Sequence, residues 1–205
     1  MKVFFQIGTN DGNDRFRKLV INYKPDIVIL VEPNNKLIQK IEKNYSDIKN
    51  VHIYNNAVYY NNDEIVDLFI SEGRNVEVAS SLFSLVPMND WGEKSDLPKI
   101  SAKSITFDQI CKNHNITEIE YLQIDTEGFD SEIIKMIDFT KYKINTLRFE
   151  RWTFGTDCFT KHNNEKSNEL GMNGMNDVKK KLTLHNYTFH DIDDEDGGDV
   201  IAFLK

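Results

Sequence analysis

Short apolar runs alternate with amphipathic stretches along most of the chain. The apolar runs have the length of strands, and residues 27–31 are apolar throughout, which is typical of a parallel strand covered on both faces. In the amphipathic stretches, apolar residues recur at the spacing of one helix face. The strand candidates are residues 2–7, 27–31, 51–54, 65–70, 120–124, 143–149, 187–192 and 200–204. The helix candidates are residues 15–23, 36–45, 131–137 and 176–184, with a further short helix after Thr106.

Two stretches interrupt this alternation. Residues 72–99 contain two glycines and two prolines without clean periodicity, and residues 151–173 are polar and rich in Asn and Lys. We expect both to be irregular insertions on the substrate side of the domain. The last two strands are joined by an acidic turn at residues 193–199, which is typical of a hairpin. The pattern predicts one α/β domain over residues 1–205, with a mostly parallel sheet, an antiparallel strand near the C-terminus and helices on both faces.

Composition narrows the class of protein. A chain of 205 residues with 40 % hydrophobic and 28 % charged residues has the make-up of one ordinary globular domain. Its net charge of −8 argues against nucleic acid as the main partner. No apolar run approaches the ~20 residues of a membrane span, and the apolar stretch at the start is too short for a signal peptide. Because Cys111 and Cys158 are isolated and form no redox or metal-ligand pair, we expect a cytoplasmic protein.

Polar residues follow four of the predicted strands, at the points where the strands end. In a doubly wound sheet, ligands bind at the carboxyl ends of the strands. Gly8 and Gly12 let the backbone after the first strand pass close to a ligand. Glu32, ~20 residues further on, is placed to accept hydrogen bonds from two ribose hydroxyls. Asn56 after the third strand could read an adenine edge, and Asp125 ends the fourth, so the segments together indicate a cofactor that carries a nucleoside.

The first of these turns narrows the choice of cofactor. Residues 8–12 read Gly-Thr-Asn-Asp-Gly in place of the Gly-x-Gly-x-x-Gly that seats a pyrophosphate, which disfavours a dinucleotide. The chain also lacks the Gly-x-x-x-x-Gly-Lys-Ser/Thr loop that binds nucleoside triphosphates. S-adenosylmethionine fits both observations, because it combines ribose and adenine with an amino-acid end in place of phosphates.

Six short blocks carry a more specific signal. They are Gly8-Thr9-Asn10-Asp11-Gly12, Val31-Glu32-Pro33-Asn34, Asn56-Ala57-Val58, Ser80-Ser81-Leu82, Ile105-Thr106-Phe107-Asp108-Gln109-Ile110 and Leu122-Gln123-Ile124-Asp125-Thr126-Glu127-Gly128. Over roughly residues 3–150, the sequence resembles the FkbM-type methyltransferases of class I. The resemblance implies a Rossmann-like fold with a seven-stranded sheet, S-adenosylmethionine as cofactor and S-adenosylhomocysteine as product. The cofactor-binding residues that it implies are Gly8, Thr9, Asn10, Asp11, Gly12, Glu32, Pro33, Asn56, Ala57, Ser81 and Asp125.

One position departs from the pattern of this family. The family usually opens its first block with Asp, and this chain has Gln6 there. If that Asp holds the methionine ammonium of the cofactor, its loss weakens binding unless Asp125 or Asp11 compensates. A degenerate fold that serves as a non-catalytic binding module is therefore one alternative to an active enzyme.

The resemblance implies O-methylation, commonly of a sugar hydroxyl, and loss of the hydroxyl proton calls for a positioned base. Asp125 is the first candidate, because it ends the fourth predicted strand, where it could act as the base or hold the methionine end. Glu127 shares this turn and could bind acceptor hydroxyls. Glu150, which ends the fifth strand, is the next candidate base, with an ion pair to a neighbouring arginine as the alternative. His162 is the histidine of the second insertion, where a plain surface position is the alternative.

The acceptor that we expect is a carbohydrate or glycoconjugate, for example a terminal deoxyhexose such as rhamnose or fucose. Trp91 and Trp152 lie in the two insertions and suit stacking on a sugar ring, although each could equally plug the core of its insertion. The chain would act alone or as one module of a larger glycan-synthesis enzyme. Alternatives are a non-sugar small molecule or a protein as acceptor, and a nicotinamide-dependent oxidoreductase on a similar sheet.

We expect no metal ion. Asp125, Glu127 and Glu150 could form an oxygen site for magnesium, as in catechol-type methyltransferases. Those enzymes are expected to carry a second Asp and an Asn after the fifth strand, where Glu150-Arg151 stands here.

Overall fold

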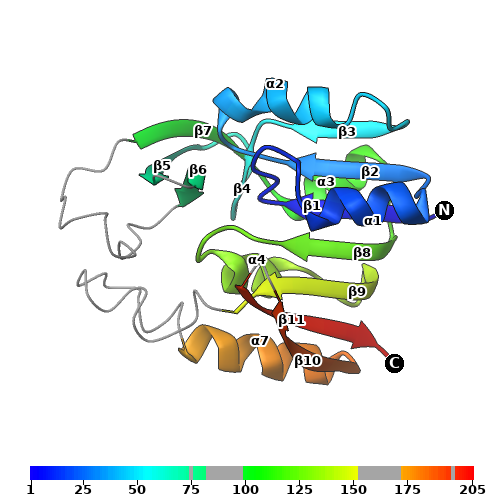
Figure 1. Cartoon of the computed structure of the whole chain (residues 1–205). Helices are drawn as coiled ribbons and strands as arrows, with labels where there is room; N and C mark the ends of the chain where they lie inside the picture. Colours follow the sequence, from blue (N-terminus) through cyan, green and yellow to red (C-terminus); the bar gives the residue numbers. More distant parts are fainter. Residues whose placement is uncertain (74–75, 82–98, 152–171, 195–196) are drawn as a thin grey trace.

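A seven-stranded sheet forms the centre of the molecule, flanked by helices on both faces. The computed structural model describes residues 1–73, 76–81, 99–151, 172–194 and 197–205 (Figure 1). The strands of this sheet lie in the order β10-β11-β9-β8-β1-β2-β3. Their bounds are β1 Val3–Ile7, β2 Ile27–Val31, β3 Val51–Tyr54, β8 Glu118–Ile124, β9 Lys143–Glu150, β10 Tyr187–Asp194 and β11 Gly197–Leu204.

Strand direction follows the sequence prediction. Strand β1 pairs in parallel with β2 and β8, and the pairs β2–β3 and β8–β9 are also parallel. Strand β11 runs antiparallel to both β9 and β10. The mostly parallel sheet with an antiparallel strand near the C-terminus is therefore confirmed. Because the carboxyl ends of β1, β2, β8 and β9 lie at one edge, the polar residues that follow these strands are brought to the same place (Figure 1).

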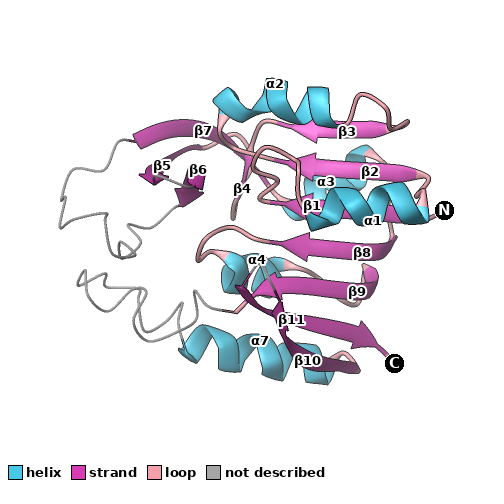
Figure 2. Cartoon of the chain, in the orientation of Figure 1, coloured by secondary structure: helices cyan, strands magenta, loops and turns pink. Residues whose placement is uncertain are grey.

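Helices cover both faces of the sheet (Figure 2), and each face carries its own hydrophobic core. Val3, Phe5 and Ile7 of β1 pack in the larger core with helices α3, α4 and α7, whereas Phe4 packs in the smaller core with α1 and α2. This alternation is the two-residue period of a strand that is covered on both faces. The helices are α1 Arg15–Tyr23, α2 Asn35–Asn44, α3 Phe107–Asn113, α4 Asp130–Met136 and α7 Met172–Leu184.

Side chains define the starts of three helices. Asp14, Asn34 and Thr106 accept hydrogen bonds from the backbone N–H groups of Arg17, Lys36 and Gln109, and so cap α1, α2 and α3. The cap expected at Thr106 is thus confirmed. No helix in the described part of the chain is long and apolar enough to cross a membrane.

A second, four-stranded sheet lies beyond the carboxyl ends of the main sheet (Figure 1). Its order is β4-β7-β5-β6, with bounds β4 Ala57–Val58, β7 Lys99–Ile105, β5 Ile65–Gly73 and β6 Val76–Ser81. The expectation that residues 72–99 are irregular throughout was wrong for β6, which pairs antiparallel with β5. The alternation of Val76, Glu77 and Val78 is a strand signal, but the glycines and prolines around it obscured it. Strand β7 also went unpredicted, although its small buried residues Ala102 and Ser104 alternate with exposed ones.

The C-terminal elements are longer than expected. Helix α7 begins at Met172, inside the range assigned to the second insertion, and β10 and β11 extend into the acidic turn. Asp193 pairs with Gly198 and Asp194 with Gly197, so the antiparallel ladder takes up most of residues 193–199. The prediction that these residues form the turn itself was therefore wrong, because glycine opposite aspartate does not prevent ladder pairing.

Candidate active site

A pocket opens where β1, β2 and β8 end, below the second sheet. Eight of the residues that line it are among those expected from sequence: Gly8, Asn10, Glu32, Pro33, Asn56, Ala57, Asp125 and Glu127. The remaining lining residues are Ile7, Val31, Val58, Leu68, Thr126, Phe129 and Ile133. Segments distant in sequence thus meet in one concave site, as the carboxyl ends of a parallel sheet allow.

Gly8 allows the ends of β1 and β8 to touch. It has a φ of 83°, and a Cβ atom at this position would lie 1.7 Å from the carbonyl oxygen of Asp125. Its N–H donates to the carbonyl oxygen of Val31 at 3.0 Å, which also joins this turn to the end of β2. Only a residue without a side chain permits this contact, so Gly8 sets the distance between the two turns that carry polar groups into the pocket.

The carboxylate of Glu32 is held in the pocket by two backbone N–H groups. One carboxylate oxygen accepts a hydrogen bond from the N–H of Asn10 at 2.8 Å, and the other accepts one from the N–H of Asn34 at 2.8 Å. Its side chain is buried, and burial raises the pKa of Glu32 to about 7, against the lowering effect of these two bonds. The carboxylate therefore has a fixed orientation, and its remaining lone pairs are available to hydroxyl donors of a ligand.

The two asparagines after β3 have different roles. Asn55 donates from its side chain to the carbonyl oxygens of Glu32 and Pro33, and so braces the end of β2. Asn56 donates to the carbonyl oxygen of Lys103 in β7, and it lines the pocket together with Ala57. Asn56 thus lies between β3 of the main sheet and β7 of the second sheet and is held there by this hydrogen bond.

An apolar wall lines part of the pocket. It is made by Val58 of β4, Leu68 of β5, and Phe129 and Ile133 at the start of α4. Phe129 stacks on Tyr59 with ring centroids 5.6 Å apart. Sequence reasoning missed this wall, because its members belong to elements that only the fold brings together. A wall of this kind suits the flat apolar face of a base.

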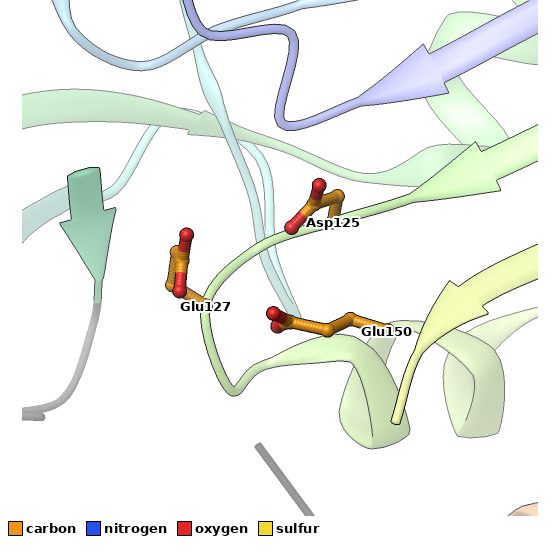
Figure 3. Close-up of side chains that lie close together, drawn as sticks. All are labelled: Asp125, Glu127 and Glu150. Carbon is orange, nitrogen blue, oxygen red and sulfur yellow. The ribbon is translucent and has the colours of Figure 1, made fainter. Parts of the chain in front are cut away.

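Three carboxylates converge where β8 and β9 end. One oxygen each of Asp125, Glu127 and Glu150 lies within 4.8 Å of the others. Figure 3 shows Asp125 and Glu127 on the turn after β8 and Glu150 at the end of β9, with their carboxylates turned toward a shared space. Glu127 takes a φ of 54° and Gly128 a φ of 111°, which reverses the chain sharply before α4. The sequence named all three residues, and the structure brings them together.

Their proximity changes their acidity. The side chain of Asp125 is exposed, and its pKa is raised above its usual range, first by partial desolvation from the surrounding protein atoms and then by the negative charge of Glu127 and Asp130. Burial raises the pKa of Glu127 to about 7, and the charge of Asp130 adds to this shift. Carboxylates at this spacing titrate as a group and can share a proton. Because the same spacing also suits a bound cation, the expectation that no metal is needed stays a prediction.

Several predicted residues support the pocket without lining it. Thr9 is buried, and its hydroxyl donates to the carbonyl oxygen of Val31 at 3.3 Å. The Asp11 carboxylate accepts from the N–H of Asn13 and shapes the turn. Gly12 has a φ of 74° and packs against the ring of Tyr45. These three residues therefore stabilise the loop at residues 8–12 through contacts inside the protein.

Ser81 ends β6, where it pairs in register with Phe69. His162, Trp91 and Trp152 lie outside the described residues.

Gln6 faces away from the pocket. It is 1 % exposed on the α1 side of the sheet, and its side-chain nitrogen donates to the Asp14 carboxylate at 2.5 Å. Asp14 in turn caps α1, and burial raises its pKa. The departure from the family pattern at position 6 thus acts on the start of α1, and the Gln6 side chain does not line the pocket.

The arginines near Glu150 have other acidic partners. Arg148 forms an ion pair with Asp199, and Arg151 forms one with Asp191 at 3.1 Å. Both acids lie on the C-terminal hairpin, so these pairs join β9 to the hairpin, while Glu150 itself extends toward Asp125 and Glu127 (Figure 3).

Comparisons with known proteins agree with this geometry. The methyltransferase FkbM domain matches residues 6–205. An O-methyltransferase from Bacillus cereus in complex with SAH superimposes with a TM-score of 0.54 at 10 % identity, covering 100 % of this chain and 74 % of that one. TomG from Streptomyces achromogenes, an O-methyltransferase involved in tomaymycin synthesis, gives 0.53 at 8 % identity, covering 100 % and 73 %. A putative caffeoyl-CoA O-methyltransferase from Staphylococcus aureus gives 0.52 at 13 % identity, covering 100 % and 76 %. At these identities the likeness concerns the fold. No curated protein sequence matches the chain.

Proposed function

The chain belongs to the FkbM methyltransferase family and is an S-adenosylmethionine-dependent methyltransferase, and we propose that it methylates a hydroxyl oxygen of a carbohydrate. The observation that carries the proposal is that one pocket combines two unlike sets of groups. Glu32 and the apolar wall line it together with Asp125 and Glu127, and Glu150 converges with these last two carboxylates.

The first set, Glu32 with the apolar wall, suits the nucleoside of the cofactor. The fixed carboxylate of Glu32 would accept hydrogen bonds from the ribose hydroxyls, while Asn56, Ala57 and the apolar wall would hold the adenine. The turn at residues 8–12 would then lie at the amino-acid end. When bound, S-adenosylmethionine supplies a methyl group on a positively charged sulfur, which is open to attack by an oxygen nucleophile.

The second set, the three carboxylates, suits a hydroxyl acceptor. An alcohol that gains a methyl group must lose its proton, and a nearby carboxylate can take it. We assign the base role to Asp125 first, with Glu127 and Glu150 orienting acceptor hydroxyls as hydrogen-bond acceptors. Because the three carboxylates titrate as a group, the proton that Asp125 accepts is shared among them before it leaves to water. Holding the acceptor in line with the methyl group can supply about 7–11 kcal/mol of the rate acceleration.

Sugars fit these carboxylates better than other acceptors do. A sugar presents several hydroxyl donors, and three carboxylates can accept from more than one of them at once. A nucleic acid would bring phosphates against these carboxylates and against a chain of net charge −8. We therefore favour a free or terminal sugar of a glycoconjugate, with deoxyhexoses such as rhamnose and fucose as the first acceptors to try, whether the chain works alone or as a module of a larger glycan-synthesis enzyme.

The first experiment is calorimetric titration with S-adenosylhomocysteine, with NADH as the control ligand. We expect micromolar binding of S-adenosylhomocysteine and none of NADH. A panel of methyl glycosides, led by rhamnoside and fucoside, then tests the acceptor through release of S-adenosylhomocysteine from S-adenosylmethionine, with catechol as the non-sugar control. Turnover on catechol but on no glycoside would refute the sugar proposal and leave the methyltransferase assignment intact. No binding of S-adenosylhomocysteine would indicate a non-catalytic binding module.

A further inference from the structure

A buried carboxylate lies directly behind the three converging ones. Asp130, the first residue of α4, is 0 % exposed. One of its oxygens accepts hydrogen bonds from both the N–H of Thr126 at 3.1 Å and the hydroxyl of Thr126 at 2.6 Å. Its other oxygen accepts from the N–H of Glu150 at 3.4 Å. A single side chain therefore bonds to the turn after β8 and to the end of β9.

These two segments carry all three converging carboxylates. Thr126 lies between Asp125 and Glu127, and Glu150 ends β9. The turn is conformationally demanding, because Glu127 and Gly128 both have positive φ angles. A non-glycine residue keeps such a conformation only where its surroundings hold it. The bonds that Asp130 accepts from Thr126 hold the start of this turn.

We propose that Asp130 is a positioning residue for methyl transfer, because its carboxylate ties the turn of Asp125 and Glu127 to the end of β9 and so makes the three carboxylates converge. The effect of Asp130 on catalysis rests on the proposed function. Its effect on the geometry of the carboxylates can be tested without any acceptor.

The three hydrogen bonds to residue 130 require a carboxylate at that position. Three donors point at two oxygens, and Asp accepts all three because an ionised carboxylate has acceptor sites only. Asparagine would keep one oxygen and turn an NH2 group toward a backbone N–H, so either Thr126 or Glu150 would lose its partner. The substitution Asp130→Asn also removes a charge, which by itself changes the acidity of Glu127. Thr126→Val removes the hydroxyl bond and leaves the charge and the two backbone bonds in place, so Thr126 is the cleaner place to weaken the link.

The chain offers a matched control on its surface. The exposed Asp138 accepts from the N–H of Thr140 at 2.9 Å and from its hydroxyl at 2.6 Å, the same pair of bonds with a similar hydroxyl distance. Thr126→Val and Thr140→Val thus remove the same kind of hydrogen bond, one at the pocket and one away from it. Thr126→Ser restores the hydroxyl and serves as the conservative rescue.

The experiment is amide hydrogen exchange followed by NMR, in the presence of EDTA, for the parent chain and these variants. The backbone N–H groups of residues 126 and 150 both donate to Asp130, so their exchange reports the link directly. In Thr126→Val these two amides should exchange about tenfold faster than in the parent, relative to the amides of β1. Thr126→Ser and Thr140→Val should stay within about threefold of the parent.

Two outcomes separate this inference from the proposed function. Exchange at residues 126 and 150 that is unchanged in Thr126→Val, or that rises only together with the amides of β1, would overturn the positioning role. Faster exchange confined to these two residues in a protein that fails to bind S-adenosylhomocysteine would uphold the positioning role and remove the proposed function. With an acceptor in hand, Thr126→Val should lower kcat and Thr126→Ser should restore it.

Discussion

Replacing Glu32 by Gln should weaken cofactor binding and remove a loss of stability that the parent suffers at alkaline pH. A hydrogen bond to a charged group contributes about 1.5–3 kcal/mol. Gln keeps one acceptor oxygen for the ribose but loses the charge and the second acceptor, so we expect a loss of about 1.5–3 kcal/mol in binding. The dissociation constant for S-adenosylhomocysteine should therefore rise about 10- to 100-fold.

The effect on stability has the opposite sign. Burial raises the pKa of Glu32 from 4.5 in the unfolded chain to about 7 in the fold. The folded state thus binds the proton more tightly, and the stability that this provides is present below pH 4.5 and is lost as pH rises through 7. The loss amounts to about 3 kcal/mol by pH 8. Gln does not ionise, so Glu32→Gln should escape this pH-dependent loss. Its NH2 group faces the N–H of Asn10 or Asn34, which adds a cost that does not depend on pH.

Calorimetry with S-adenosylhomocysteine and thermal unfolding at pH 5 and pH 8 test both effects. Glu118→Gln makes the same chemical change at the exposed start of β8, where Glu118 pairs with Lys143, and it serves as the control for both measurements. The reasoning fails if Glu32→Gln binds within threefold of the parent. It also fails if the stability of the variant relative to the parent does not rise between pH 5 and pH 8.

Three further predictions concern the three carboxylates and the turn beside them. Gly8→Ala should destabilise the fold by about 2–4 kcal/mol and abolish binding of S-adenosylhomocysteine, because its methyl group would overlap the Asp125 carbonyl oxygen; unchanged thermal unfolding would contradict this. Asp125→Asn should lower kcat at least 100-fold, as expected for loss of a base, with little change in cofactor affinity, and equal turnover would remove Asp125 from the base role. Turnover should rise with pH and level off once the coupled carboxylates that include the base Asp125 have lost their proton, because the pKa values of Asp125 and Glu127 are both raised, that of Glu127 to about 7. A flat profile from pH 5.5 to 8.5 would contradict this assignment, and EDTA should leave the plateau unchanged.

The parts of the site that follow strand ends were predictable from sequence. Gly8, Glu32 and Asp125 each stand directly after an apolar run, and a parallel sheet brings such positions to one edge. The convergence of Glu127 and Glu150 follows from the same rule, because β8 and β9 are neighbours. These inferences needed only the order of the strands and no knowledge of side-chain packing.

Contacts between elements that are distant in the chain could not be predicted from the sequence. Leu68 and Ile133 read as ordinary core residues of a strand and a helix, and nothing local says that they face a ligand. Asp130 reads as a first-turn acid of α4, where a favourable interaction with the helix end is the usual explanation. Its bonds to Thr126 and Glu150 depend on the angle at which α4 meets β9, which no local pattern specifies.

The second sheet separates the choice of ligand from the stability of the fold. Ala57 and Leu68 line the pocket, but they belong to a small core with Val66 and Ala102 that is distinct from the two cores of the main sheet. Substitutions in clusters that share no partners have nearly independent effects on folding free energy. Ala57 and Leu68 can therefore diverge among descendants of one ancestral gene, whereas Val58, Phe129 and Ile133 of the wall belong to the larger core and stay under constraint with the seven-stranded frame. The same separation makes β5 and β7 the place to build a library for altered substrate choice.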